Sequence, residues 1–162
     1  MNILGLIPSR IGSQRLPAKA LLPISNIPLV IHTYRRAKLS KLLSEIKICT
    51  DSQKIINVAK KFKSKAVITS SHHHNGTERI AEVFLKEKKK YDLVIDIQGD
   101  EPLISPYHID EIIKFHQKNM DVDIVLPTLE LKIADNPSLV KVVTNKKNEV
   151  MYLSRAKLPY EA

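Results

Sequence analysis

The chain has 162 residues, 43% of them hydrophobic, which is sufficient for one soluble domain with a hydrophobic core. Its single cysteine, Cys49, excludes an intramolecular disulfide scaffold and a zinc ribbon, and it favours a reducing compartment. The formal net charge of +9 is concentrated in residues 1–81, where 14 basic and 3 acidic residues give +11, whereas residues 82–162 hold 12 and 14 and give −2.

The first predicted element is a strand over residues 3–8 (ILGLIP), a short apolar run closed by a proline. Such a run is typical of a strand that is buried on both faces of a parallel sheet. Pro8 and Arg10 end the run too early for a membrane span or a secretory leader. We therefore expect a cytoplasmic protein with no membrane partner.

Strands and helices then alternate along the chain. Pro28 precedes a segment with apolar residues at helical spacing, which predicts a helix over 29–43, and the pattern continues with a strand at 46–51, a helix at 53–63 and a strand at 65–71. The region of the second of these helices holds lysines whose spacing suits a solvent-exposed helix face: Lys54, Lys60, Lys61 and Lys63, with Lys65 just beyond the helix.

The same alternation continues to residue 119. Thr77 or Asn75 is expected to cap a helix over 78–90, residues 92–100 (DLVIDIQGD) predict a strand, and Pro106 begins a helix over 107–119. This last helix has its apolar positions on one face: Ile109, Ile112, Ile113 and Phe115. Units of about 25 to 30 residues predict an α/β protein with a mainly parallel sheet flanked by helices.

The final forty residues differ from the rest, because residues 122–132, 140–146 and 149–155 predict strands with little helix between them. A mixed or antiparallel C-terminal edge is expected there. We interpret residues 1–162 as a single nucleotide-binding α/β domain.

Polar loops follow each predicted parallel strand, and ligands bind at this carboxyl edge of open α/β sheets. The first loop places Arg10, Arg15 and Lys19 around Gly12 and Ser13, which predicts a cradle for a triphosphate, with an ordinary solvated loop as the alternative. The loop matches neither the Walker A pattern nor Gly-x-Gly-x-x-Gly, so kinase, GTPase and dinucleotide-binding functions lose their usual support.

The loop at 98–102 (QGDEP) offers acidic side chains directly after a buried strand. Asp100 is a candidate ligand for Mg²⁺, which prefers oxygen ligands. Glu101 is expected to orient the loop, and Asp96 either points inward or is a second acidic partner. The alternative is a simple turn in which the aspartate caps its own backbone.

The loop at 69–79 contains three consecutive histidines, His72 to His74, before a predicted helix N-terminus. Adjacent histidines do not share one helical face, so the spacing disfavours a zinc site. The free amides of the helix N-terminus predict contacts to a base, a ribose or an anion. Cys49 has no assignable base and is interpreted as a buried strand residue.

Four motifs in order resemble the CMP-Kdo synthetases (3-deoxy-manno-octulosonate cytidylyltransferases). IPSRIGSQRLPAKAL (7–21) resembles IPAR-x-x-S-x-RLPGKPL, HHNGTER (73–79) resembles H-x-SGTER, QGDEP (98–102) is identical, and YLSRAKLP (152–159) resembles Y-x-SR-x-x-IP. Ala18 stands where this family usually has glycine, and Ala20 where it has proline. The resemblance implies a Rossmann-like nucleotide-diphospho-sugar transferase fold.

The resemblance also implies a reaction and the residues that carry it. The anomeric hydroxyl of the eight-carbon sugar acid Kdo attacks the α-phosphorus of CTP, giving CMP-Kdo and pyrophosphate for lipopolysaccharide biosynthesis, with Mg²⁺ as cofactor. Arg10, Lys19 and Asp100 would be catalytic, and Asp100 would hold the metal. The implied nucleotide-binding residues are Leu6, Pro8, Arg10, Ser13, Arg15, Lys19, Ser71, Gly76, Thr77 and Arg79, and those near the sugar acid are Gln98 and Arg155.

Members of this family are homodimers and continue beyond the point that corresponds to Ala162, with a second metal-binding aspartate and much of the dimer interface in that further portion. Two alternatives to full activity therefore stay open. One is a truncated CTP-binding remnant with little or no catalysis. The other is a basic nucleic-acid-binding module, which 5% aromatic content and the absence of a recognised motif disfavour.

Overall fold

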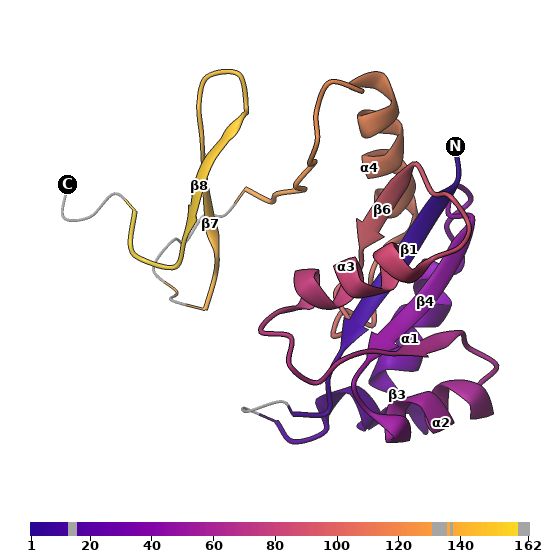
Figure 1. Cartoon of the computed structure of the whole chain (residues 1–162). Helices are drawn as coiled ribbons and strands as arrows, with labels where there is room; N and C mark the ends of the chain where they lie inside the picture. The colour runs from indigo at the N-terminus through magenta and orange to yellow at the C-terminus, as the bar shows by residue number, and fades with distance from the viewer. Residues whose placement is uncertain (13–15, 131–135, 137, 159–162) are drawn as a thin grey trace. The chain divides into compact units, whose positions relative to one another are not determined.

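The computed structural model describes residues 1–12, 16–130, 136 and 138–158 of the chain. The chain forms two compact units, residues 1–121 and 122–162 (Figure 1). The expectation that residues 1–162 act as one nucleotide-binding domain stays a prediction.

The first unit is built on a four-stranded parallel sheet with the strand order β5-β4-β1-β6 (Figure 1). The central strand β1 pairs with β4 on one side, where Ile7 lies opposite Ile48, and with β6 on the other, where Leu4 lies opposite Val94. The parallel pairing confirms the predicted α/β fold. The four strands are β1 (Ile3–Ser9), β4 (Glu45–Thr50), β5 (Ala66–Ile68) and β6 (Leu93–Asp96).

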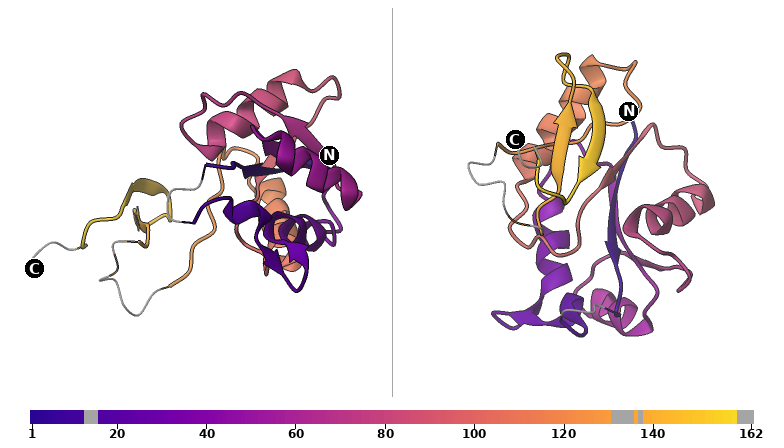
Figure 2. Two further views of the ribbon diagram at one scale, coloured as in Figure 1. Left: turned by 90° about the horizontal axis from the view of Figure 1, so that it is seen from below. Right: turned by 90° about the vertical axis from the view of Figure 1, so that its left-hand side faces the viewer.

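Helices cover both faces of this sheet (Figure 2), and the two-residue period of β1 supplies a core to each face. Ile3 and Ile7 pack in one core with α1, α2 and α4, whereas Leu4 and Leu6 pack in the other with α3. In the described part of the chain, no helix has the length and apolar character needed to cross a bilayer. The helices are α1 (Leu29–Ala37), α2 (Gln53–Lys61), α3 (Gly76–Lys86) and α4 (Pro106–Lys118).

Three short elements interrupt the polar loop that was expected between β1 and α1. A 3-10 turn, η1 (Lys19–Leu21), leads into a hairpin of β2 (Pro23–Ile24) and β3 (Ile27–Pro28). Ser25 and Asn26 turn this hairpin with φ values of 48° and 66°, the two positive values that a two-residue hairpin turn of type I′ requires.

Helix α1 ends at Ala37, six residues before the predicted end, because tertiary hydrogen bonds hold the next segment. The Asp110 carboxylate accepts hydrogen bonds from the Ser40 hydroxyl and from the backbone N–H groups of Lys41 and Leu42. Desolvation alone raises the pKa of Asp110, but these donors outweigh it, and the net pKa lies below its usual value. Sequence periodicity carries no information about such a contact.

Three further details of the helices were left open or predicted wrongly. Asn75 rather than Thr77 is the N-cap of α3, and its side chain accepts a hydrogen bond of 2.8 Å from the Glu78 N–H. This helix ends at Lys86, not at residue 90. Phe115 is 54% exposed and does not share the buried face of Ile109 and Ile113 on α4.

In its described residues, the second unit contains an antiparallel hairpin of β7 (Lys141–Thr144) with β8 (Val150–Ser154), in which Val142 lies opposite Leu153. This pairing confirms the antiparallel C-terminal strands. The strand predicted for 122–132 is wrong over residues 122–130, where no strand is present, and residues 131 and 132 lie outside the described residues. Ile124 and Leu129 in this segment are more than 80% exposed, so their apolar character does not reflect burial in a sheet.

Candidate functional site

Two loops pack against the carboxyl end of β1 at the same residue, Pro8. A Cβ atom added to Gly99 would lie 2.6 Å from the Pro8 carbonyl oxygen, and one added to Gly76 would lie 3.1 Å from Pro8 Cγ. Gly99 therefore has no room for a Cβ atom, whereas a Cβ at position 76 would make a tight contact with the Pro8 ring. The close contacts bring the predicted nucleotide-binding segment and the QGDEP loop together at the predicted edge of the sheet.

A buried hydroxyl on α1 fixes the QGDEP loop from the side. The Thr33 Oγ1 donates to the Gly99 carbonyl oxygen at 3.3 Å, and the side chain of Thr33 is fully buried. Because Gly99 directly precedes Asp100, this contact helps to fix the backbone from which the candidate metal ligand Asp100 extends.

Lys19 and Asp100 form an ion pair at this edge, although they are 81 residues apart in the sequence. The side chains remain 35% and 51% exposed, so both charges are open to solvent. Ala18, directly before Lys19, has a left-handed backbone conformation with φ 51° and ψ 31°. The first and fourth loops are thus joined through the two residues with the most clearly predicted chemistry.

Two polar residues next to this pair interact with each other. Gln98 Nε2 donates to Asp96 Oδ1 at 3.2 Å, and Gln98 is exposed. Desolvation by the surrounding protein raises the pKa of Asp96 above its usual value. Asp96 is the last residue of β6, and its carboxylate contacts Gln98 at the edge of the sheet. The next residue, Ile97, is buried.

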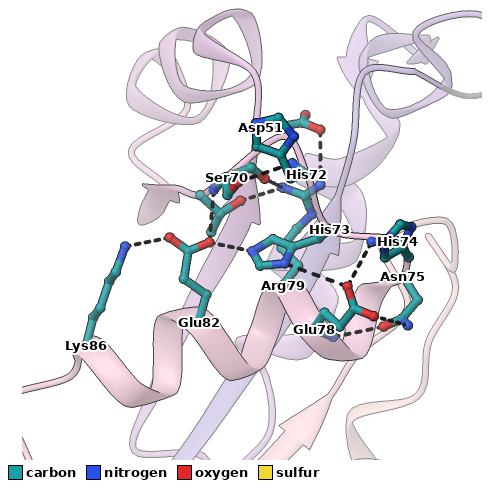
Figure 3. A network of polar contacts seen from close by, with 11 residues as sticks. Asp51, Ser70, His72, His73, His74, Asn75, Glu78, Arg79, Glu82 and Lys86 are labelled. Carbon is teal, nitrogen blue, oxygen red and sulfur yellow. Dashed lines mark hydrogen bonds and ion pairs between the residues drawn. The ribbon is translucent and has the colours of Figure 1, made fainter.

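A second ion pair, between Asp51 and Arg79, lies deeper in the same region (Figure 3). The distance from Arg79 Nη2 to Asp51 Oδ2 is 3.0 Å, and Arg79 is only 3% exposed. Its Nη1 donates to the Thr69 hydroxyl and to the Ser70 carbonyl oxygen. The guanidinium is therefore surrounded by acceptors from two loops.

The histidine-containing loop is held by two glutamates of α3 (Figure 3). Glu82 accepts hydrogen bonds from Lys86, His73 and the Ser70 N–H, which lower its pKa to about 2. Glu78 accepts from the His74 N–H at 2.9 Å. His73 thus contributes to the structure of the loop, and within the described residues no group of three or more His, Cys, Asp and Glu side chains is placed to hold a metal.

The other predicted site residues are distributed as follows. Arg10 is exposed directly after β1, Ser71 is exposed in the third loop, and Thr77 is exposed in the first turn of α3. Leu6 is fully buried, and its carbonyl oxygen accepts a hydrogen bond from the Ile97 N–H. Arg155 belongs to the second unit, where it donates to the Ser138 carbonyl oxygen at 2.7 Å. Ser13 and Arg15 lie outside the described residues.

Cys49 is fully buried in β4, as predicted, and burial raises the pKa of its thiol to about 12. Two residues of the site were not singled out in the sequence. Asp51 had a usable signal, because it directly follows a predicted strand. Thr33 had none, since a threonine in the middle of a helix is ordinary until the neighbouring loop is known.

The sequence also matches a family model described as cytidylyltransferase over residues 4–162. The chain belongs to the cytidylyltransferase family. A 3-deoxy-manno-octulosonate cytidylyltransferase of Chloroherpeton thalassium is 39% identical over 99% of this chain and 67% of its own length. An 8-amino-3,8-dideoxy-manno-octulosonate cytidylyltransferase of Shewanella sediminis is 37% identical over 99% of this chain and 67% of its own length.

A solved cytidylyltransferase structure agrees with this assignment. It is described as CMP:2-keto-3-deoxy-manno-octonic acid synthetase complexed with CTP, has a TM-score of 0.85 and 34% identity, and covers 99% of this chain and 67% of that chain. The predicted relationship to the N-terminal portion of the CMP-Kdo synthetases is therefore confirmed. The chain spans about two thirds or less of the length of the curated relatives it matches.

Proposed function

We propose that this cytidylyltransferase chain binds CTP and activates 3-deoxy-manno-octulosonate to CMP-Kdo with release of pyrophosphate. The observation that carries the proposal is the pairing of Lys19 with Asp100 at the carboxyl edge of the sheet. A cation for phosphate oxygens and a carboxylate for a divalent cation are the two charges that a metal-nucleotide complex needs. The names of the relatives support CTP and Kdo as substrates.

The donor set around Asp100 fits Mg²⁺ bound together with a nucleotide. Mg²⁺ is usually held by one or two carboxylates plus substrate phosphates and waters, rather than by a cage of protein ligands. Asp100 supplies one exposed carboxylate, and its partner Lys19 is exposed enough to leave this ion pair and bind a phosphate instead. When bound, the cation would neutralise charge on the phosphate oxygens of CTP.

The protein side chains would contribute position and charge rather than a covalent intermediate. Arg10 and Lys19 would bind the triphosphate and stabilise the negative charge that grows on the departing pyrophosphate. The anomeric hydroxyl of Kdo would lose its proton to water, and its oxygen would form a bond to the α-phosphorus while the bond from that phosphorus to the α,β-bridging oxygen breaks. Gln98 and Arg155 are proposed to contact the sugar acid.

The wider setting follows from the same reaction. CMP-Kdo formation would serve lipopolysaccharide biosynthesis in the cytoplasm, and the acting species is proposed to be a homodimer. Relatives named for Kdo and for its 8-amino analogue have similar identity to this chain, 39% and 37%. Both sugar acids are therefore included in the test.

Pyrophosphate release from CTP, Mg²⁺ and each sugar acid tests the reaction. We expect release with at least one acid and a loss of about 100-fold for Lys19→Ala and for Asp100→Ala, the size typical of removing one stabilising charge. Lys114→Ala and Glu111→Ala are matched controls, because they remove a surface ion pair on α4. CTP binding without release from either acid would overturn the transfer reaction and leave a CTP-binding protein.

Calorimetry of CTP with Mg²⁺ tests the site separately from the reaction. The heat of binding is expected to fall in Lys19→Ala and in Asp100→Ala but not in the two α4 variants. Heats that are unchanged in both site variants would contradict the assignment of Lys19 and Asp100.

A further inference from the structure

The buried pair of Asp51 and Arg79 has no part in the reaction proposed above, yet it connects three of the loops at the carboxyl edge. Arg79 comes from α3, Asp51 follows β4 directly, and both contact residues that lie outside their own elements. Neither residue faces solvent freely, since their side chains are 4% and 14% exposed. The pair is therefore part of the framework under the site.

The guanidinium of Arg79 is committed to protein acceptors. Nη2 donates to Asp51 Oδ2 at 3.0 Å, and Nη1 donates to the Thr69 hydroxyl and to the Ser70 carbonyl oxygen at 3.1 Å (Figure 3). A buried charge that lost these partners would be strongly destabilising. Because the Arg79 side chain is only 4% exposed, a direct contact to a nucleotide would require it to move away from these partners.

Asp51 passes this constraint on to the first loop. Its other carboxylate oxygen, Oδ1, accepts a hydrogen bond from the Ile11 backbone N–H at 3.4 Å. Ile11 directly follows Arg10, one of the two described cationic residues of that loop. One carboxylate thus joins α3 to the backbone from which Arg10 extends.

The pair also matters for charge. An isolated carboxylate beside Arg10 would repel a triphosphate, but Arg79 at 3.0 Å neutralises Asp51. The attraction between Arg10 and the ligand is then not offset by the negative charge of Asp51. The Asp51 carboxylate still accepts the hydrogen bond from Ile11.

We propose that Asp51 and Arg79 are positioning residues for the triphosphate-binding loop. Arg79 fixes the Asp51 carboxylate, and Asp51 fixes the backbone at residues 10–12 so that Arg10 is presented to the nucleotide. The role in nucleotide binding rests on the proposed function. The family resemblance implies that Arg79 binds the nucleotide; in this proposal Arg79 instead acts through Asp51 and does not contact CTP.

The first test needs no ligand. Amide hydrogen exchange at Ile11 is expected to be about tenfold faster in Asp51→Asn than in the unsubstituted chain, because a charged acceptor for this N–H is lost. Asp92→Asn is the matched control. The Asp92 carboxylate, directly before β6, also accepts a hydrogen bond from a backbone N–H, that of Asn2. Unchanged exchange at Ile11 in folded Asp51→Asn would overturn the proposal.

The second test measures the affinity for CTP with Mg²⁺ in Asp51→Asn, Arg79→Lys and the double variant. Positioning through one connected pair predicts that each single change weakens binding by about tenfold and that the double variant is no more than about twofold weaker than either. Lysine keeps the charge of Arg79 but presents it as a compact group that does not reproduce the planar fork of donors.

The opposite pattern would overturn the proposal in a distinct way. If Arg79 contacted CTP directly, Asp51→Asn would free the guanidinium and leave affinity equal or higher, whereas Arg79→Lys alone would reduce it. Thr69→Val, which removes one acceptor of Arg79 without changing charge, replaces any variant that does not fold and is expected to weaken CTP binding in the same direction.

The two tests separate this inference from the proposed function. An unsubstituted chain that binds no CTP would contradict the proposed function, while faster exchange at Ile11 in Asp51→Asn would still show the mechanical link. CTP binding that is unaffected by both single variants would contradict the positioning role and leave the proposed function intact.

Discussion

Two ion pairs at the carboxyl edge of the sheet differ sharply in their surroundings. The side chains of Lys19 and Asp100 are 35% and 51% exposed, whereas those of Arg79 and Asp51 are 4% and 14% exposed. Both pairs join segments that are far apart in the sequence. Only the exposed pair has partners that water, a phosphate or a cation can reach.

The exposed pair suits ligand exchange, and the buried pair suits structural support. An exposed pair typically stabilises a protein by about 1 kcal/mol or less, so its partners separate at little cost. Removing one partner of a buried pair costs about 3–5 kcal/mol, because the other charge is left uncompensated. The exposed pair is therefore fitted to bind a metal nucleotide, and the buried pair to hold the loops around it.

The largest expected effect comes from breaking the buried pair. Arg79→Met leaves the Asp51 carboxylate without its guanidinium and should lower the free energy of unfolding by about 3–5 kcal/mol. Urea denaturation followed by circular dichroism measures this change. Lys19→Met is the matched control at the exposed pair, with an expected loss of about 1 kcal/mol or less. Equal losses in the two variants would remove the basis of the comparison.

Gly99→Ala tests the support of the exposed pair. The added Cβ would meet the Pro8 carbonyl oxygen at 2.6 Å, so the backbone before Asp100 must shift. We expect a loss of about 1–3 kcal/mol in the free energy of unfolding and weaker CTP binding in calorimetry. Gly12→Ala is the control for the free energy of unfolding, because a Cβ at Gly12 meets nothing within 4 Å. A Gly99→Ala variant as stable as Gly12→Ala would contradict this packing.

Much of this framework could be predicted from the sequence, and the two pairs show where prediction stops. Short apolar runs between amphipathic segments identified the parallel strands, because burial on both faces leaves a pattern in the sequence. The place of the exposed pair could also be predicted once the parallel strands were identified. Lys19 and Asp100 each follow a strand, and the ends of parallel strands meet at one edge.

The buried pair depends on information that local patterns do not carry. Arg79 looks like any polar residue of a helix N-terminus until the neighbouring loops supply Thr69, Ser70 and Asp51 as partners. The early end of α1 has the same origin, since it depends on Asp110 from α4. The false strand at 122–130 shows the converse, because apolar residues such as Ile124 are exposed in the structure.

A fall in pH should destabilise the protein through Glu82, a carboxylate whose exposure lies between those of the two ion pairs. Glu82 has a side chain that is 16% exposed, and hydrogen bonds from Lys86, His73 and the Ser70 N–H lower its pKa from 4.5 to about 2. A lowered pKa stabilises the fold above pH 4.5, and this contribution is lost as the pH falls from 4.5 towards 2. Solvent screening limits it to about 1 kcal/mol.

Urea denaturation at a series of pH values between 7 and 2 measures this contribution. In Glu82→Gln the free energy of unfolding should fall less steeply below pH 4.5 than in the unsubstituted chain. Glu111→Gln is the control, because Glu111 is 45% exposed and pairs with Lys114 on the surface of α4. Parallel curves for Glu82→Gln and the unsubstituted chain would show that the lowered pKa of Glu82 contributes nothing to the free energy of unfolding.

The smallest expected effect concerns the backbone that leads to the exposed pair. Ala18 has φ 51° directly before Lys19, a left-handed conformation that costs a residue with a Cβ about 1–2 kcal/mol. Glycine removes this cost but loses about 0.4–1 kcal/mol through the greater freedom of the unfolded chain, so Ala18→Gly should stabilise the protein by about 0.5 kcal/mol. Ala81→Gly, at an exposed position inside α3, should have the opposite sign and cost about 1 kcal/mol. Thermal unfolding of both variants measures the two signs, and destabilisation by Ala18→Gly would mean that the conformation at Ala18 carries no strain.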